Sequence, residues 1–375
     1  MLHSPENLLT DLNKWYGRNA RRLPWRVGPT ERANGVQPDA YRVWLSEIML
    51  QQTTVPHAAP YFQDFVERWP VVTDLAAASW EEVSAAWAGL GYYSRARNLH
   101  ACAQVLAKRL NDGTGFPQTA ADWRALPGIG PYTAAAVAAI AFDEPVAPMD
   151  GNIERVVSRL WAVESDRSEA GWRAAKKVAA GRAQALFDAA WPKVRAQTAA
   201  RMRPGDLAQA LMDLGAMVCT STRPNCDICP FAKGCMALSA GDPARYPMKP
   251  EKKERPVRYG AAFVLTRRGG EVLLVRRPPK GLLGGMLMPP TSAWRERDVA
   301  SALDDGLSEA PAATSWSHIG EVRHVFTHFA LRLNVYRADA DGPATNVEGE
   351  WMTIDAAIAA SPTVGRKALA LALKD

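Results

Sequence analysis

One helix without a single charge constrains this fold more than any other part of the chain. Residues 132–142 are mostly alanine and carry no charge, so we expect a helix that is buried on all sides with other helices close against it. Gly128 and Gly130 precede it, where a tight turn can adopt positive φ and present backbone N–H groups to an anion. Pro131 suits the first turn of a helix. The stretch predicts a helical domain with a glycine hairpin.

A carboxylate follows this helix, because Asp150 lies in a Pro-Met-Asp-Gly-Asn turn. A hairpin that presents amides to phosphate, a buried helix and then an acid together indicate a protein that grips a nucleic-acid backbone beside a carboxylate. An ordinary interhelical turn followed by a capping aspartate explains the same residues about as well. The rest of the chain has to decide between these two interpretations.

Length and net charge limit the number of domains and the kinds of partner that this protein can have. At 375 residues the chain exceeds a single core of usual size, so two or three domains are expected. The net charge of +6 favours polyanionic partners without reaching the density of a histone-like tail. No apolar run is as long as a membrane span, and the N-terminus lacks a basic region followed by an apolar one. We therefore expect a soluble, cytoplasmic protein that does not enter a membrane.

Two changes of pattern divide the chain. A short helix over residues 6–18 and a loop over 27–39 precede helical patterning that continues to residue 238, and residues 239–256 are rich in proline and charge, as in a linker. Beyond the linker the pattern gives strands at 261–265, 272–275 and 329–336 and helices at 297–307 and 354–360. The sequence predicts a mostly α-helical domain over residues 1–238 and an α+β domain over 257–375.

Four of the five cysteines form one compact array, Cys219-x6-Cys226-x2-Cys229-x5-Cys235. This crowding, with Cys102 standing alone, suits disulfides poorly. A structural zinc site is the alternative, but zinc modules usually pair two Cys-x2-Cys knuckles, and here there is one knuckle and no histidine nearby. The spacing favours a [4Fe–4S] cluster bound by the four thiolates.

Glu47 interrupts an otherwise apolar helix face between residues 44 and 53. Desolvation of a carboxylate at such a place raises its pKa and makes it a proton donor near neutral pH. A glutamate on the solvent-facing surface of the helix fits this window as well. Glu47 is therefore a candidate general acid.

Taken together, these motifs resemble the helix-hairpin-helix DNA glycosylases with an iron–sulfur cluster, and within them the MutY-type adenine DNA glycosylases. The resemblance extends from about Leu8 to the C-terminus. It rests on the hairpin, the cysteine array and the segments Leu-Pro-Trp (23–25), Ser-Glu-Ile-Met-Leu-Gln-Gln-Thr (46–53), Gly-Leu-Gly-Tyr-Tyr-Ser-Arg-Ala-Arg-Asn-Leu (89–99), Asp-Gly-Asn (150–152) and Met-Asp-Leu-Gly-Ala-Met-Val-Cys (212–219). It implies base excision repair, in which a monomer binds double-stranded DNA and flips out adenine mispaired with 8-oxoguanine or guanine.

The resemblance also implies the catalytic residues. Glu47 matches the general acid that protonates adenine N7, and Asp150 matches the carboxylate that stabilises the oxocarbenium-like sugar. Two carboxylates in different environments divide the work, as in glycoside hydrolysis. Tyr132 and Asn152 match supporting residues beside the sugar and its attacking water.

Further matches concern the adenine pocket. Gln209 matches a reader of the adenine edge, for which an amide is well suited. Leu23, Trp25 and Arg26 would line the same pocket, although a core role suits Trp25 nearly as well.

Other matches concern the DNA around the lesion. Gln52 and Tyr92 match residues that wedge into the base stack, whereas a buried tyrosine would also explain Tyr92. The remaining residues expected to contact DNA in this domain are Gln51, Thr53, Leu90, Gly128 and Gly130.

In the second domain, Phe326-Thr327-His328 resembles the Phe-Ser-His loop that contacts 8-oxoguanine, with Thr327 in place of serine. A histidine in an ordinary strand is the alternative for His328. The domain also resembles a Nudix fold, but residues 296–307 lack the Glu-rich metal-binding pattern of Nudix hydrolases. We therefore expect this Nudix-like domain to recognise 8-oxoguanine and not to hydrolyse nucleotides.

Three other functions fit part of the sequence. An endonuclease III-like bifunctional glycosylase/lyase shares the hairpin, the aspartate and the cluster, but it needs a lysine where Tyr132 stands, because Schiff-base chemistry requires an amine. A non-catalytic damage sensor needs only the hairpin and basic residues, and the presence of both Glu47 and Asp150 argues against it. A Nudix hydrolase is disfavoured by the missing metal-binding pattern.

Overall fold

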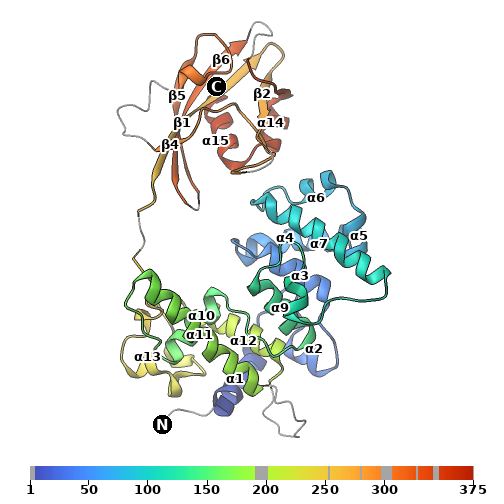
Figure 1. Ribbon diagram of the computed structural model, residues 1–375, viewed down its shortest axis with the longest axis vertical. Coiled ribbons are helices and arrows are strands. Elements are labelled where there is room, and N and C mark those ends of the chain that lie inside the picture. Colours follow the sequence, from blue (N-terminus) through green and yellow to red (C-terminus); the bar gives the residue numbers. More distant parts are fainter. Residues whose placement is uncertain are drawn as a thin grey trace. The chain divides into compact units, whose positions relative to one another are not determined.

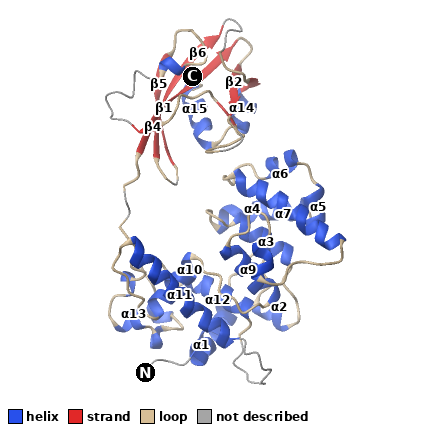
Figure 2. Cartoon of the chain, in the orientation of Figure 1, coloured by secondary structure: helices blue, strands red, loops and turns tan. Residues whose placement is uncertain are grey.

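The computed structural model describes residues 5–190, 202–251, 254–278, 281–296, 306–326, 328–340 and 346–374. The chain divides into two compact units, Met1–Glu251 and Lys252–Asp375. Helices build the first unit, and the second carries a β-sheet (Figures 1 and 2). The predicted fold class, a mostly helical domain followed by an α+β domain, is confirmed.

Helices and short 3-10 turns account for all regular structure in the described part of the first unit. They are α1 Pro5–Asn19, α2 Pro29–Ala33, α3 Ala40–Met49, α4 Val55–Arg68, α5 Val72–Ala77, α6 Trp80–Ala86, α7 Tyr93–Asn111, α8 Ala120–Arg124, α9 Pro131–Phe142, α10 Gly151–Leu160, α11 Glu169–Ala190, α12 Pro204–Met217, η1 Cys226–Ile228, η2 Ala232–Gly234, α13 Met236–Ser239 and η3 Pro243–Arg245. Within the described part of the chain, no helix is both long and apolar enough to cross a membrane.

The charge-free helix α9 is buried within the first unit. Every residue from Thr133 to Ile140 is buried, and α3, α8 and α12 pack around it. The close approach of α12 needs Gly205, since a Cβ there would lie 2.8 Å from the carbonyl oxygen of Ala139. The prediction of a helix surrounded by other helices is therefore correct, and the small side chains of α9 are what allow it.

The loop predicted over residues 27–39 contains the short helix α2, so that prediction is wrong for Pro29–Ala33. The Glu31 carboxylate accepts a hydrogen bond from the Gly28 N–H (2.7 Å) and closes the first turn. Arg32, only 3% exposed, forms an ion pair with Asp143 at 2.7 Å. Local capping and one buried ion pair thus order a segment whose glycine and proline content is typical of a loop.

The segment 239–256, predicted as a linker, packs partly on the helical unit. Tyr246 and Met248 are buried against Ala237. The Tyr246 hydroxyl donates to Glu164 (2.6 Å), and the Arg159 Nε donates to the Tyr246 carbonyl oxygen (2.9 Å). The first half of this segment therefore belongs structurally to the first unit.

The second unit is built on a sheet with the strand order β3-β2-β1-β6-β5, in which β1 and β6 run parallel and β5 and β6 antiparallel. Its described elements are β1 Val257–Arg267, β2 Glu271–Arg276, β3 Leu287–Met288, β4 Arg295–Glu296, η5 Leu307–Glu309, β5 Ser317–Val325, β6 Ala330–Ala340, β7 Glu350–Thr353, α14 Ile354–Ala360 and α15 Thr363–Ala372. Helix α15 packs on β5, β6 and β1.

The three strands and the helix 354–360 predicted for the second unit are present. Strand β5 and helix α15 were not predicted. Most of the helix predicted over 297–307 lies outside the described residues, and Leu307 begins a 3-10 turn.

Candidate active site

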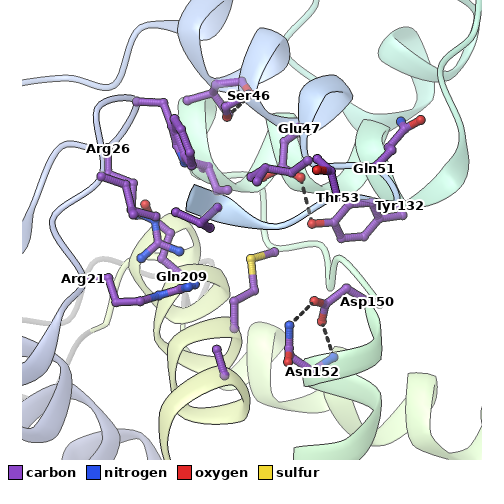
Figure 3. A pocket seen from close by; sticks show the side chains of 18 residues that line it. Arg21, Arg26, Ser46, Glu47, Gln51, Thr53, Tyr132, Asp150, Asn152 and Gln209 are labelled. Carbon is purple, nitrogen blue, oxygen red and sulfur yellow. Dashed lines mark hydrogen bonds between the residues drawn. The ribbon is translucent and has the colours of Figure 1, made fainter. Parts of the chain in front are cut away.

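A pocket of about 270 Å³ opens in the helical unit, between α3, α9, α12, the N-terminus of α10 and residues 21–26 (Figure 3). Among the residues predicted from the sequence, those that line it are Leu23, Trp25, Arg26, Glu47, Gln51, Thr53, Tyr132, Asp150, Asn152 and Gln209. The other lining residues are Arg21, Val43, Ser46, Leu50, Val55, Ile140, Met212 and Ala216. The fold thus brings together residues that lie up to 195 positions apart in the chain, from Arg21 to Ala216.

Glu47 lies on α3 and is only 6% exposed, so the interpretation as a solvent-facing glutamate is wrong. Asp39 caps this helix by accepting from the N–H of Tyr41 (2.8 Å). Burial raises the pKa of Glu47 and the hydrogen bond from Tyr132 lowers it, and the resulting pKa is about 7. The charge of Asp150 raises the same pKa further. Glu47 can therefore hold a proton near neutral pH.

Tyr132 is the second residue of α9 and its side chain reaches Glu47. Its hydroxyl donates a hydrogen bond to Glu47 Oε2 at 2.7 Å (Figure 3). Burial, followed by the neighbouring charges of Glu47 and Asp150, raises the pKa of Tyr132 well above its usual value. The phenol therefore stays neutral and acts as a donor toward the carboxyl group.

Asp150 is the N-cap of α10 and lines the pocket as well. Its Oδ1 accepts from the N–H groups of Asn152 (3.0 Å) and Ile153 (2.7 Å), and its Oδ2 accepts from Asn152 Nδ2 (2.8 Å). Burial raises the pKa of Asp150, while these hydrogen bonds lower it. The capping interpretation and the functional one are thus compatible, because one carboxylate caps the helix and faces the pocket.

A buried charge network lies behind the pocket and was not predicted. Asp213 on α12 is 0% exposed and accepts from Arg26 Nη1 (2.8 Å to each oxygen), from Arg21 Nε (2.5 Å) and from the Arg21 N–H (3.0 Å). Gln209, 3% exposed, lies one turn before Asp213 on the same helix. An aspartate inside the apolar stretch 207–218 was the sequence signal that could have revealed this network.

Trp25 combines the two roles considered for it. It is 7% exposed, and its ring packs edge-on against Phe62 with centroids 5.2 Å apart. It also lines the pocket. The indole is therefore both a core residue and a wall of the site.

Two loops beside the pocket present residues in left-handed conformations. Gln52 has φ 59° and Tyr92 has φ 49°. The side chain of Tyr92 is 51% exposed, so the interpretation as a buried tyrosine is wrong. Leu90, by contrast, is only 5% exposed, and a DNA contact through its side chain is excluded in this conformation.

The glycine hairpin agrees with the prediction at one position only. Gly128 has φ 72°, and a Cβ there would lie 2.4 Å from Cβ of Asn98. Gly130 has φ −82° and is the N-cap of α9, so the expectation of positive φ is wrong for it. Position 128 therefore requires glycine for two reasons: its φ is positive, and a Cβ there would clash with Asn98.

The four clustered cysteines line one small cavity of about 20 Å³ together with Arg159. Arg159 Nη1 donates to Cys219 Sγ (3.3 Å). Burial raises the pKa of Cys229 to about 12 and also raises the pKa values of Cys226 and Cys235. The cysteines are free thiols, and in the described ranges no group of three His, Cys, Asp or Glu side chains converges tightly enough to hold a single metal ion.

In the second unit, the predicted 8-oxoguanine loop connects β5 to β6. Phe326 is half-buried and stacks on Trp294 (5.7 Å between centroids), with Phe329 at 4.9 Å and His324 at 4.6 Å. His328 is exposed and lies between the strands, so it is not a strand histidine. Thr327 lies outside the described residues. Phe326 and His328 are the two predicted contacts that the structure describes, and His328 is the more exposed of them.

Known proteins resemble both units of this chain. The family model described as "HhH-GPD superfamily base excision DNA repair protein" matches residues 45–180, and the NUDIX domain model matches residues 261–371. The adenine DNA glycosylase of Homo sapiens is 34% identical, over 91% of this chain and 69% of that protein. The chain belongs to the adenine DNA glycosylase family. Other members include those of Rattus norvegicus (35%, 92% and 73%) and Mycolicibacterium smegmatis (36%, 85% and 97%).

Membership of the adenine DNA glycosylase family confirms the resemblance inferred from the motifs. Position 132 carries no amine, and the hydroxyl of Tyr132 there donates to Glu47. The family assignment covers both units, since the matched stretches of the relatives span most of the chain.

Proposed function

We propose that this protein removes adenine mispaired with 8-oxoguanine or guanine from double-stranded DNA, by hydrolysis and without lyase activity. Its family makes it a DNA glycosylase of base excision repair that acts on adenine. The observation that carries the proposed mechanism is a single pocket holding two carboxyl groups in different environments, the buried Glu47 and the half-buried Asp150. We also propose that it acts as a monomer.

Glu47 donates the proton in the proposed reaction. Tyr132 occupies Oε2 of the carboxyl group, which leaves Oε1 to carry the proton. With a pKa of about 7, the group is protonated in a large fraction of molecules near neutral pH. Protonation of adenine N7 turns a poor leaving group into a neutral one, so the bond between N9 and the sugar can break.

Asp150 stabilises the charge that this step creates. When the glycosidic bond breaks, its electron pair leaves with the adenine and the sugar becomes cationic. The N-terminal N–H groups of α10 and the Asn152 amide favour the carboxylate form of Asp150. Water then adds to the sugar, and its proton returns to the Glu47 carboxylate, which restores the enzyme.

The remaining lining residues bind the base. Gln209 and Arg26 supply donors and an acceptor for the edge of adenine. Leu23 and Trp25 supply apolar walls against which the flipped base can pack. Both polar side chains are held in place by α12, Arg26 through Asp213.

We also propose that Cys219, Cys226, Cys229 and Cys235 hold a [4Fe–4S] cluster. An all-sulfur donor set around one small cavity suits an iron–sulfur cube, whose four ligands are more widely spaced than those of a single ion. When bound, the cluster would tie the loop between α12 and α13 together. Binding requires the thiols to lose their protons, so cluster assembly should release protons.

The second unit is proposed to recognise 8-oxoguanine. The exposed His328, next to a phenylalanine ring that Trp294 holds by stacking, offers an imidazole on a supported loop. 8-Oxoguanine differs from guanine by one carbonyl and one ring N–H, so a placed hydrogen-bonding group can distinguish them.

Base release under single-turnover conditions tests the function. Duplexes should contain adenine opposite 8-oxoguanine, adenine opposite guanine, or thymine glycol. We expect release from the first two, strand cleavage only after added alkali, and little covalent complex after borohydride. Activity confined to thymine glycol would overturn the assignment, and efficient borohydride trapping would overturn the monofunctional mechanism.

A further inference from the structure

The guanidinium group of Arg95 joins two loops of the helical unit. Arg95 lies in the first turn of α7 and is 8% exposed. Its Nη1 donates to the carbonyl oxygens of Ile48 (2.9 Å), Met49 (3.1 Å) and Gln51 (2.7 Å). Its Nη2 donates to the carbonyl oxygens of Leu90 (3.0 Å) and Gly91 (3.2 Å). Five backbone acceptors from two separate segments therefore share one side chain.

The first group of acceptors belongs to the end of the helix that carries Glu47. The last carbonyl groups of a helix have no partner within it, and a cation at that end is favourable. Arg95 supplies both the donors and the charge at the C-terminus of α3. Arg95 of α7 thus helps to hold the end of α3, and with it the proposed general acid Glu47, in place.

The acceptors of the second group, the carbonyl groups of Leu90 and Gly91, directly precede Tyr92. The first group ends at the carbonyl group of Gln51, directly before Gln52. Gln52 (φ 59°) and Tyr92 (φ 49°) both adopt a left-handed conformation, which is costly for residues other than glycine and persists only when the surroundings hold it. The carbonyl groups bound by Arg95 belong to Gln51 and Gly91, directly before each of them. The Arg95 Cζ also lies 5.8 Å from the centroid of the Tyr92 ring.

We propose that Arg95 is a positioning residue that couples these two loops, so that Gln52 and Tyr92 enter the DNA as one unit while Glu47 is held in register. The inference rests on the proposed function, since by the family resemblance Gln52 and Tyr92 are expected to wedge into the base stack at the lesion. A planar fork with donors on two sides is required, because one edge of the group faces each loop. Lysine keeps the charge but cannot bridge both loops in the same way.

The test is a double-mutant cycle in the full-length protein, with Q52A and Y92A made singly and together. Single-turnover adenine release and the fluorescence of 2-aminopurine placed beside the target adenine report rate and unstacking. In the wild-type background we expect the combined loss to be smaller than the product of the single losses, by about threefold or more. In the R95K background the two losses should simply multiply.

R97K is the matched control, because Arg97 lies two residues further along α7, is exposed, and covers the Trp80 ring. R95K should lower the rate about tenfold or more, whereas R97K should stay close to wild type. Circular dichroism and thermal melting establish whether R95K is folded. If R95K is unfolded, the wild-type cycle alone decides, since independent effects of Q52A and Y92A there would overturn the proposal.

Two failures can be told apart. A wild-type protein that does not release adenine would refute the proposed function itself. A wild-type protein that releases adenine, with the same coupling between Gln52 and Tyr92 in R95K as in wild type, would refute only the role of Arg95.

Discussion

The pocket of the helical unit and the loop of the second unit are held in different ways. In the pocket the two carboxyl groups and one guanidinium group each have a hydrogen-bond partner: Tyr132 for Glu47, Asn152 for Asp150, and Asp213 for Arg26. In the loop, one half-buried ring is stacked and His328 is exposed between two strands. Chemistry requires charges fixed in advance, whereas recognition of a base needs only a few groups that can reach it. Substitutions should therefore have larger effects in the first region than in the second.

The largest effect is expected from the two carboxyl groups. Glu47→Gln should lower the single-turnover rate by about 10² to 10⁴, because it removes the proton donor, and Asp150→Asn should cause a comparable loss by removing charge stabilisation. Binding to the mispair should persist in both. Gel-shift titration and quenched-flow base release measure the two properties.

Glu81→Gln, on the exposed surface of α6, is the matched control and should behave like wild type. Asp150→Asn also weakens the cap of α10, so its melting temperature needs to be recorded. Near-normal release by either active-site variant would move the chemistry away from this pocket.

The next effect concerns stability. It tests how much the buried Asp213 network contributes to the free energy of unfolding. Asp213→Asn leaves Arg21 and Arg26 without their buried counter-charge, which should cost about 3 to 5 kcal/mol of unfolding free energy. Urea denaturation measures this difference. Asp64→Asn breaks an exposed pair with Arg68 and should cost no more than about 1 kcal/mol. Equal losses in the two variants would contradict the importance of burial.

A smaller effect is expected in the second unit. His328→Ala should reduce the preference for 8-oxoguanine over guanine by about 1 to 3 kcal/mol, and the rate of adenine release opposite guanine should change little. Binding has to be compared at matched salt concentration. His318→Ala, on the exposed surface of β5, is the control. An unchanged preference in the His328 variant would assign recognition to another surface.

The smallest effect is a shift in pH dependence. The protonated form of Glu47 is the active one and its pKa is about 7, so the rate should fall by about tenfold per unit once the pH is well above that value. The hydrogen bond from Tyr132 lowers this pKa, and its removal in Tyr132→Phe raises it further. The falling limb of the pH–rate profile should therefore move to higher pH. Tyr246→Phe, which breaks a similar bond to the distant Glu164, should leave the limb in place.

The sequence could reveal the fold class because its strongest patterns are local. Alanine over residues 132–142 without charge permits a buried helix, and short runs of apolar and β-branched residues predicted β1, β2 and β6. Strand β5 escaped prediction because its residues are mostly exposed or half-buried, so it lacks a continuous apolar run. Helix α2 escaped because an ion pair to Asp143, over a hundred residues away, stabilises it.

The candidate site shows the same division. Glu47 stands out in the sequence as one acid on an apolar face, and Asp150 as an acid in a turn. Asp213 stands out as one acid in an apolar stretch, but its partners Arg21 and Arg26 do not. Arg95 does not stand out, since its importance comes from the carbonyl groups of two loops that are distant in the chain. Sequence patterns reveal side chains with unusual neighbours in the chain, whereas only a structure reveals shared partners.

The small side chains of α9 have a consequence for the distance between the two acids. Helix α9 lies against α3, which carries Glu47, and against α12, which in turn packs on α10, whose cap is Asp150. The thickness of α9 therefore determines how far apart the proton donor and the anion stand. A substitution such as Ala136→Val, at a residue that is 0% exposed and does not line the pocket, would widen that separation and slow the reaction without removing any reacting group.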